Sequence, residues 1–313
     1  MSWTPPANDR RVPFRQRATA GEWRAAIELV ARRHGLFPCE LEPYEKGETV
    51  VWRAGEHVIK LTSPECAYQI EAEVGCLGAV AGKLPVEVPR LFAHGELEGF
   101  PYVVMQRLGG RPLAEVWPRL DAEQRRRLAG DLGRLCHALH ALPPPGFRPD
   151  WESFFRSCRA DLPERQRRYG GPLPLLEAIE PFLRRVGPLD DGPLVPLHTE
   201  VLDQHVYVVE EGGTVQLSGL IDFADARLGP YEYEFSGVIE FIFRGEPGLL
   251  REFLLAYGLP EARLTSAYSE TLLAWSLSHR FTQLRRLLAV IAPRAPESLE
   301  ALAAILFSVE PAR

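Results

Sequence analysis

The sequence has few cysteines, and none of them form a recognisable pair. Five are scattered through 313 residues without a Cys-x-x-Cys motif: Cys39, Cys66, Cys76, Cys136 and Cys158. An odd number at such spacing argues against a disulfide framework and against a zinc site. We therefore expect a protein of a reducing compartment, the cytoplasm.

Long apolar runs are also missing. The first 17 residues contain three prolines and no apolar core of a signal peptide. Nowhere in the chain do about 18 uncharged apolar residues follow one another, as a membrane-spanning helix requires. The sequence thus predicts neither secretion nor a membrane span.

An excess of basic charge is absent as well. The chain carries 36 lysines and arginines against 42 aspartates and glutamates, which gives a formal net charge of −6. This balance does not draw the chain to nucleic acid or anionic lipid, whereas it tolerates a cationic small molecule. We expect no nucleic-acid or membrane partner, and we interpret the arginine runs at 125–127 and 165–168 as solvated faces. The sequence does not indicate an oligomeric state.

What is present is the composition of an ordinary globular protein of about two domains, with 46% hydrophobic residues. The first third has mixed helix and strand patterns. These predict a helix from Thr19, strands at 41–44, 49–52 and 57–61, a helix over 63–81, and strands at 90–93 and 102–106. The Gly109-Gly110 pair indicates a domain boundary at about residue 108.

Beyond residue 108 the pattern is mainly helical. Behind Asp121, leucines recur at steps of four, three, four and three up to Leu142, which predicts a helix. Amphipathic runs begin near residues 175, 232, 249, 271 and 298, and Pro/Gly-rich loops are predicted at 143–146 and 169–174. One predicted hairpin, with strands at 206–209 and 215–222, interrupts the helices.

Residues that carry chemistry lie around this hairpin. Glu200 lies two residues after His198, and His205 lies seven residues after His198. Asp222 follows the second strand of the hairpin. Phosphoryl transfer needs one carboxylate at the acceptor hydroxyl and a second acid on Mg²⁺, and a loop followed by a tight hairpin brings the two together. Asp222 is flanked by apolar residues, where an unpaired charge is costly, which favours a metal ligand.

Several segments resemble the aminoglycoside phosphotransferase family, over nearly the whole chain. Residues 102–110 resemble its last small-lobe strand and hinge, and 132–140 its LGxxLxxLH helix. Residues 221–226 match its IDxxDA segment, and 229–234 are similar to its GDPxYD run. The order of these segments and the region 241–245 look most like hygromycin kinases.

The resemblance implies a two-lobed α+β fold like that of protein kinases, with a small antiparallel-sheet lobe and a larger, mainly helical lobe. It implies a nucleotide-binding lobe at 1–108 and a catalytic and acceptor-binding lobe at 109–313. The implied activity is transfer of phosphate from ATP or GTP, with Mg²⁺, to an alcohol group. The acceptor is a small hydroxylated, cationic molecule such as an aminoglycoside.

The resemblance also implies roles for particular residues. Lys60 would pair with nucleotide phosphates, and Glu73 would hold it as an ion pair, with Glu71 as a rival two positions away. The full nucleotide-binding set is Lys60, Glu73, Thr49 in a loop over the phosphates, and the backbones of Gln106 and Leu108 at the adenine.

Two positions depart from the family pattern HGDxxxxN. Glu200 stands where the family has aspartate and keeps a catalytic carboxylate. His205 stands where the family has asparagine, as a metal ligand beside Asp222, although Mg²⁺ prefers oxygen. These changes leave two alternatives open: a pseudokinase that binds nucleotide without transfer, and a kinase of a peptide or another natural product.

Some polar and aromatic residues have two interpretations. We expect packing roles for five of them: His137, His140, Trp275, His279 and Phe281. The alternative is that one of the last three lines the acceptor cleft. Three acids either attract ammonium groups or lie on a helical surface: Glu232, Glu234 and Glu240.

Overall fold

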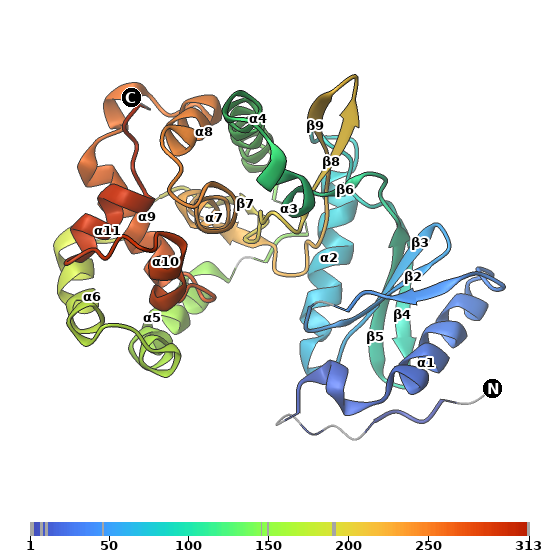
Figure 1. The fold of residues 1–313 in the computed structure, drawn as a ribbon. Coiled ribbons are helices and arrows are strands. Elements are labelled where there is room, and N and C mark those ends of the chain that lie inside the picture. Colours follow the sequence, from blue (N-terminus) through green and yellow to red (C-terminus); the bar gives the residue numbers. More distant parts are fainter. Residues whose placement is uncertain are drawn as a thin grey trace.

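A computed structural model describes residues 3–6, 9, 12–45, 47–144, 146–148, 150–189 and 192–311. It has two lobes (Figure 1): a small one built on an antiparallel sheet and a larger one made mainly of helices. Pro145, in the predicted loop 143–146, lies outside the described residues. The predicted α+β architecture is confirmed.

Five short strands form the sheet of the small lobe, antiparallel and in the order β1-β2-β3-β5-β4. Their bounds are β1 Leu41–Pro43, β2 Val50–Ala54, β3 His57–Leu61, β4 Leu91–Leu97 and β5 Phe100–Gln106. All five were predicted. The β4–β5 hairpin is longer than predicted because Glu98 and Gly99, both at positive φ, close a tight turn.

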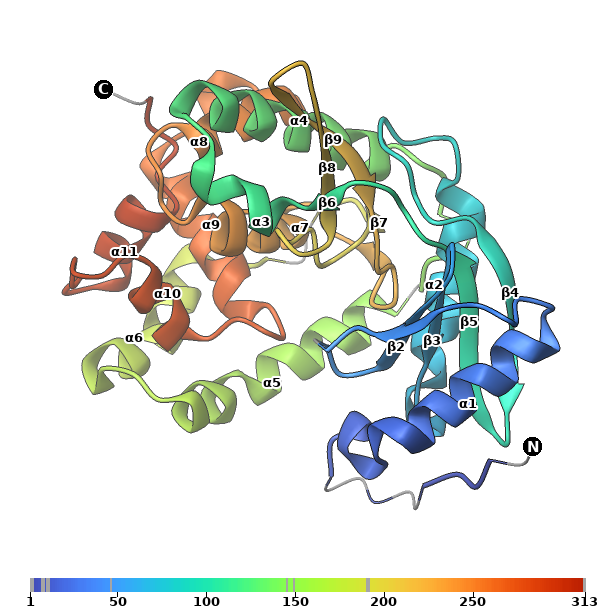
Figure 2. The same cartoon turned by 45° about the vertical axis from the view of Figure 1, so that its right-hand side comes forward.

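Helix α1 (Ala20–Arg33) covers one face of this sheet, and its predicted capping box joins Thr19 and Glu22. Helix α2 (Ala67–Val80) covers the other face, on the side of the larger lobe, as Figures 1 and 2 show. A 3₁₀ turn (Pro64–Cys66) precedes α2, so the single helix predicted over 63–81 is wrong at its start. Ser63 caps nothing because its hydroxyl bonds the Glu65 carboxylate.

The sheet separates two hydrophobic cores, and alternation along the strands decides which residue enters which core. Ile59 and Leu61 of β3 are buried in the core under α1. Val103 and Met105 of β5 face the other way, into the core shared by α2 and the larger lobe. Lys60, between Ile59 and Leu61, therefore points toward α2.

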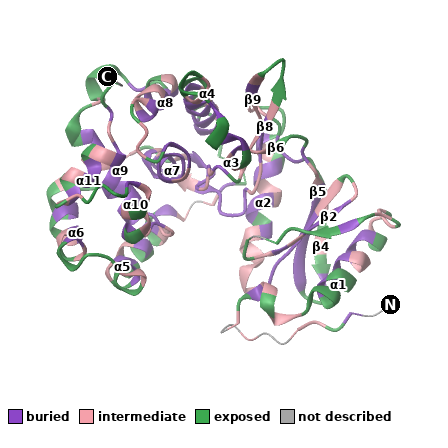
Figure 3. Cartoon of the chain, viewed as in Figure 1, coloured by how far each residue is buried: buried purple, intermediate pink, exposed green. Residues whose placement is uncertain are grey.

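The larger lobe is built from helices of very different lengths, and its buried faces form the main core (Figure 3). They are α3 Leu113–Val116, α4 Ala122–His140, α5 Trp151–Tyr169, α6 Leu173–Val186, α7 Glu232–Gly237, α8 Leu249–Tyr257, α9 Ser266–Ser278, α10 Leu284–Val290 and α11 Leu299–Leu306. Asp121 caps α4 as predicted, with Gln124 completing a capping box. Gly133 lets α4 approach α8, because a Cβ there would lie 2.3 Å from the Phe253 carbonyl oxygen.

Short strands form two small sheets in this lobe. β6 (Arg111–Pro112), β8 (Val206–Glu211) and β9 (Thr214–Leu220) form one sheet, and β7 (Val195–Leu197) pairs with β10 (Arg227–Gly229). Gly212 and Gly213 close the predicted hairpin, both with positive φ. β9 ends at Leu220 and not at residue 222, because Asp222 takes a left-handed backbone that ends strand pairing.

Two other predictions for this lobe are wrong. Helix α5 was not predicted, and together with α6 it reduces the loop expected at 169–174 to three residues, 170–172. The arginine run at 165–168 is not a solvated face throughout. Arg165 is buried and donates to the backbone carbonyls of Cys158, Leu277 and His279. None of the helices in the described ranges combines the length and apolarity that crossing a bilayer requires.

Candidate active site

A buried ion-pair cluster joins the two lobes at the cleft. The Lys60 ammonium lies 2.9 Å from Glu73 Oε2 on α2 and 2.6 Å from Asp222 Oδ1 of the larger lobe. Lys60 and Glu73 are buried, whereas Glu71 is exposed. The structure thus pairs Lys60 with Glu73 and leaves the rival Glu71 in solvent. We call Lys60, Glu73 and Asp222 the lysine cluster.

Charge pairing shifts the ionisation of this cluster. Burial opposes the Asp222 charge, but the Lys60 ammonium and His205 hold the pKa of Asp222 well below its usual range. Burial likewise opposes the Lys60 charge, and the carboxylates of Asp222 and Glu73 raise the Lys60 pKa nonetheless. Lysine and aspartate are therefore both charged over the whole physiological range.

The loop from His198 to His205 is held from behind by a buried acid. Glu234 Oε2 accepts the His198 backbone N–H at 2.6 Å. The His198 ring lies between the Ile221 carbonyl oxygen, 2.9 Å from Nε2, and the Glu200 N–H, 3.2 Å from Nδ1. A carbonyl can only accept and an N–H can only donate, so His198 is neutral with its proton on Nε2. Burial lowers the pKa of His198, which also favours the neutral ring.

Glu200 is the loop's acid without a partner. Within the described chain its carboxylate accepts no hydrogen bond and forms no ion pair, although the residue is largely buried. Burial raises the pKa of Glu200 to about 7, against the opposing field of His205. The charges of Asp225 and Asp222 contribute to that rise, and the Arg280 guanidinium opposes it. An acid with a pKa near neutrality, at the end of a loop beside Asp222, is suited to accept a proton.

His205 bridges Glu200 and Asp222. Its Nδ1 lies 2.9 Å from the Glu200 carbonyl oxygen, which can only accept, so Nδ1 carries a proton and Nε2 is the ring nitrogen that can offer a lone pair to a metal. That Nε2 lies 3.7 Å from Asp222 Oδ2. The two atoms can face a single divalent cation from the same side.

The donor set fits a divalent cation held mainly by its nucleotide. No group of three or more His, Cys, Asp or Glu side chains converges anywhere in the described residues. Mg²⁺ typically takes one or two protein carboxylates and completes its shell with phosphate oxygens and water. Asp222 matches that preference, while the imidazole of His205 suits softer metals better.

The predicted adenine contacts lie where β5 leaves the small lobe. The Gln106 N–H already donates to the Arg90 carbonyl at 2.9 Å, whereas the Leu108 N–H donates to no other described residue. Thr49 lies one residue before β2 and two before Val51, which pairs with Lys60. Its side chain has no contact that defines a role.

Three acids were expected either to lie on a helical surface or to attract ammonium groups of a ligand. In the structure all three are buried and paired with side chains of the protein. Glu232 binds Arg263, Glu234 lies 3.6 Å from His140 Nε2, and Glu240 binds Arg286 at 2.6 Å. Glu232 and Glu234 lie on α7, which packs against α9, and Glu240 lies on the π-helical segment Val238–Phe243 that follows; their spacing in the sequence did not reveal this burial.

The packing roles expected of the histidines and aromatics hold in part. His140 packs against Tyr257, at 2.9 Å from its hydroxyl, and Trp275 is buried in the core. His279 and Phe281 belong instead to a small recess of about 30 Å³ beside Glu200. Burial lowers the pKa of His279 to about 3, so it is neutral there.

Sequence reasoning missed Arg280. Its guanidinium binds Asp225 Oδ1 at 3.0 Å and hydrogen-bonds Tyr68 on α2, so it links the segment after Asp222 to the small lobe. Its partners lie 55 and more than 200 residues away in the chain, and no local motif signals them.

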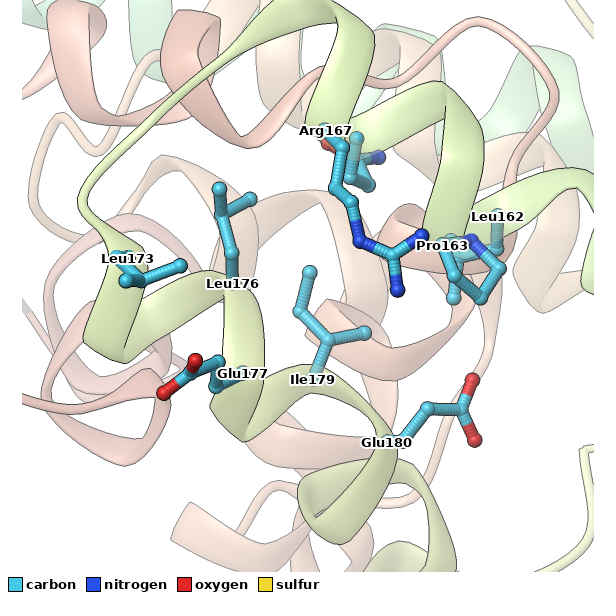
Figure 4. Close-up of a pocket in the computed structure, with 9 residues that line it drawn as sticks. Leu162, Pro163, Arg167, Leu173, Leu176, Glu177, Ile179 and Glu180 are labelled. Carbon is cyan, nitrogen blue, oxygen red and sulfur yellow. The ribbon is translucent and has the colours of Figure 1, made fainter.

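A larger hollow lies between α5 and α6, away from this site (Figure 4). It measures about 340 Å³ and is lined by apolar side chains, among them Leu162, Leu176 and Ile179, and by the charged Arg167, Glu177 and Glu180. It contains none of the predicted site residues. We assign no function to it.

Comparison with known proteins agrees with this geometry. The sequence profile of the phosphotransferase enzyme family matches residues 40–271. A curated relative, lysine-specific demethylase JMJ21 of Arabidopsis thaliana, is 23% identical over 215 residues. That stretch covers 55% of this chain and 23% of the relative, so the chain spans less than a quarter of that protein's length.

Solved structures that share this fold include aminoglycoside phosphotransferases. The GDP complex of aminoglycoside 2'-phosphotransferase-IIIa is 17% identical, with a TM-score of 0.64 over 80% of this chain and 87% of that one. A type VIII aminoglycoside-3'-phosphotransferase is 23% identical, with a TM-score of 0.58 over 82% and 97%. APH(3'')-Id from Streptomyces rimosus is 17% identical, with a TM-score of 0.58 over 82% and 98%. On the match of its sequence to residues 40–271 of the profile, this chain belongs to the phosphotransferase enzyme family.

Proposed function

We propose that the protein transfers the terminal phosphoryl group of ATP or GTP to a hydroxyl of a small molecule. The observation that carries this proposal is the lysine cluster, in which Lys60 contacts both Glu73 and Asp222. The unpartnered Glu200 lies in the next loop, close enough for Asp222 to raise its pKa. Transfer needs these three functions together: a cation at the phosphates, an acid for the metal and a base at the hydroxyl.

On the nucleotide side, Lys60 binds phosphate oxygens while Glu73 fixes its position. The Gln106 carbonyl and the Leu108 N–H hold the adenine, and Thr49 lies near the phosphates. We propose that residues 1–108 form the nucleotide-binding lobe and residues 109–313 the catalytic and acceptor-binding lobe. Support comes from Lys60 and Glu73 on β3 and α2 facing Asp222 and Glu200 across the cleft.

On the metal side, Asp222 Oδ2 and His205 Nε2 would hold Mg²⁺. Bound there, the ion would neutralise charge on the phosphate groups. Lys60 keeps the Asp222 carboxylate ionised, and the Glu200 carbonyl fixes the His205 ring so that Nε2 presents its lone pair. Glu200 orients the acceptor hydroxyl and takes its proton, for which a pKa of about 7 is suited.

Aminoglycosides are the acceptors that the structural relatives suggest first. Relatives of this fold are known as complexes with kanamycin, streptomycin and gentamicin. The acceptor expected from the sequence, a cationic hydroxylated molecule of the hygromycin or another aminoglycoside type, stays a prediction for this chain. So do cytoplasmic location and the absence of nucleic-acid and membrane partners.

The test is acceptor-dependent release of ADP. The protein is incubated with ATP, Mg²⁺ and a panel of aminoglycosides, other hydroxylated small molecules and serine or threonine peptides. Asp222→Asn serves as the inactive control. Release with a small hydroxylated molecule that Asp222→Asn abolishes supports the proposal. Release with peptides alone, or in both proteins alike, contradicts it.

A second candidate is nucleotide binding without transfer. Two observations favour it: Lys60 contacts the carboxylate that a metal would use, and an imidazole replaces the expected oxygen ligand. If this candidate is correct, calorimetry shows that the wild type binds ATP with Mg²⁺. No ADP is then released with any acceptor of the panel or with water.

A further inference from the structure

The recess beside Glu200 offers little to an ammonium group. Two acids line it, Glu200 and Glu240. Glu240 is buried and already accepts from the Ser276 hydroxyl, the Thr282 hydroxyl and the Arg286 guanidinium. Glu200 is therefore the single acid of this recess left for a ligand, and the proposed transfer needs it at the reacting hydroxyl.

Three acids around the catalytic loop share one arrangement. Each pairs with an arginine, and in each pair the acid is the buried partner. The acid side chains are only 1–10% exposed, and the arginine side chains are 28–54% exposed: Glu240 with Arg286, Asp225 with Arg280, and Asp203 with Arg244. At these three positions an approaching molecule therefore meets guanidinium groups, while Glu200 and Asp222 remain beside them as carboxylates.

Two of these arginines lie on aromatic rings at the recess. The Arg286 guanidinium carbon lies 4.3 Å from the ring centre of Phe241, and that of Arg280 lies 4.3 Å from the ring centre of Phe281. Both phenylalanines are partly exposed and line the recess. The recess itself, about 30 Å³, takes only a small group, so most of a ligand lies against its aromatic and cationic rim.

An arginine in an ion pair can still bind a second anion. A guanidinium has five N–H donors in a fixed plane, of which one carboxylate uses one or two. Arg286 donates to Glu240 and to the Phe281 carbonyl through Nη2 alone, and its Nη1 donates to no described residue. Nη1 remains for a carboxylate of the acceptor.

We infer that the acceptor is a hydroxylated molecule with an aromatic or other flat apolar face and an anionic group, and not a polyamine. This inference rests on the proposed function, because it names the molecule that would place its hydroxyl at Glu200. The flat face lies against Phe241 and Phe281, the anion meets Arg286, and the hydroxyl reaches Glu200.

The test uses three acceptors with a common hydroxymethylphenyl group and a para substituent that is anionic, neutral or cationic. The probes are 4-(hydroxymethyl)benzoate, 4-(hydroxymethyl)benzyl alcohol and 4-(hydroxymethyl)benzylamine, with kanamycin as the polyamine. Binding to the full chain in the presence of Mg²⁺ and a non-hydrolysable ATP analogue is followed by calorimetry, and transfer by ADP release with ATP. We expect the benzoate to bind at least tenfold more tightly than the benzylamine, and kanamycin more weakly than the benzoate.

A matched pair of variants tests the assignment to Arg286. Arg286→Met alone would leave the buried Glu240 without its cation, so the double variant Arg286→Met with Glu240→Gln removes both charges. It should abolish the preference for the benzoate over the neutral alcohol. Glu240→Gln alone leaves Arg286 free of its acid and should keep or increase that preference. Thermal unfolding confirms that both variants fold.

The outcomes separate this inference from the proposed function. Tighter binding of the benzoate without ADP release keeps the acceptor class and contradicts transfer. Tighter binding or faster transfer of the benzylamine or of kanamycin overturns the acceptor class and leaves transfer standing. Absence of binding by every probe, or an unchanged preference in the double variant, also overturns the inference.

Discussion

The two halves of the candidate active site treat charge in opposite ways. In the lysine cluster, Lys60 meets two carboxylates, and burial is offset by ion pairs. In the loop beside it, Glu200 is largely buried without a partner, and its pKa rises to about 7. Paired charges favour a fixed geometry, whereas an unpaired buried acid costs stability and stays free to react. Under the proposed function, Lys60 therefore holds the phosphates in position and Glu200 exchanges a proton.

The largest expected effect is on the lysine cluster. Lys60→Met leaves Glu73 buried without its cation, so the free energy of unfolding should fall by about 3–5 kcal/mol in urea denaturation. The double variant Lys60→Met with Glu73→Gln should recover much of this loss. Glu71→Gln, at an exposed position of the same helix, is the control and should change little. Equal stability of Lys60→Met and the wild type would show that the cluster is not a coupled pair.

Removal of the Glu200 charge should affect the rate and not nucleotide binding. Glu200→Gln keeps the shape of the side chain, and phosphate transfer should fall by roughly 10²-fold or more, the scale of general-base assistance. ATP affinity by calorimetry should stay near the wild-type value, and Glu200→Asp should be less harmful. Glu211→Gln on the exposed hairpin is the control. A wild-type rate in Glu200→Gln would exclude this loop as the catalytic centre.

The same acid predicts opposite pH trends for activity and stability. Its pKa is about 7 in the folded protein against an ordinary value of 4.5. Transfer should therefore rise with pH through about 7, as the base ionises. The folded state holds the proton more tightly, so this group's contribution to stability is complete below pH 4.5 and is lost as the pH rises through about 7.

A comparison of melting temperatures checks the second trend. Glu200→Gln should melt several degrees above the wild type at pH 8 and at the same temperature near pH 4. A difference of the same size at both pH values would mean that the folded protein does not raise the pKa of Glu200.

The smallest effect is expected at His205, which in the proposed site shares the cation with Asp222 and the nucleotide. His205→Asn replaces imidazole with an oxygen ligand, so nucleotide binding should shift by a few-fold toward Mg²⁺ and away from Mn²⁺. Calorimetry with each metal measures the ratio, and His94→Asn on the exposed strand β4 is the control. An unchanged ratio would remove His205 from the metal site.

The sequence by itself determined the local elements and the order of the site residues. Capping boxes at Thr19 and Asp121, alternation along Val58-Ile59-Lys60-Leu61 and the glycine turn of the hairpin depend on neighbours a few residues apart. Backbone propensity and side-chain periodicity act over that range. The positions of Lys60, Glu200 and Asp222 could be assigned in the same way, because the segments around them match a known pattern.

Only the tertiary structure decided which charges meet. The choice of Glu73 over Glu71, the burial of Arg165 and Glu240, and the left-handed turn that ends β9 before Asp222 all depend on packing between distant segments. Arg280 and Arg286 reach acids 55 and 46 residues away, so no window of sequence shows that the loop is rimmed by guanidinium groups. Electrostatic energy depends on distance and burial in space, and both are set when the helices of the larger lobe pack together.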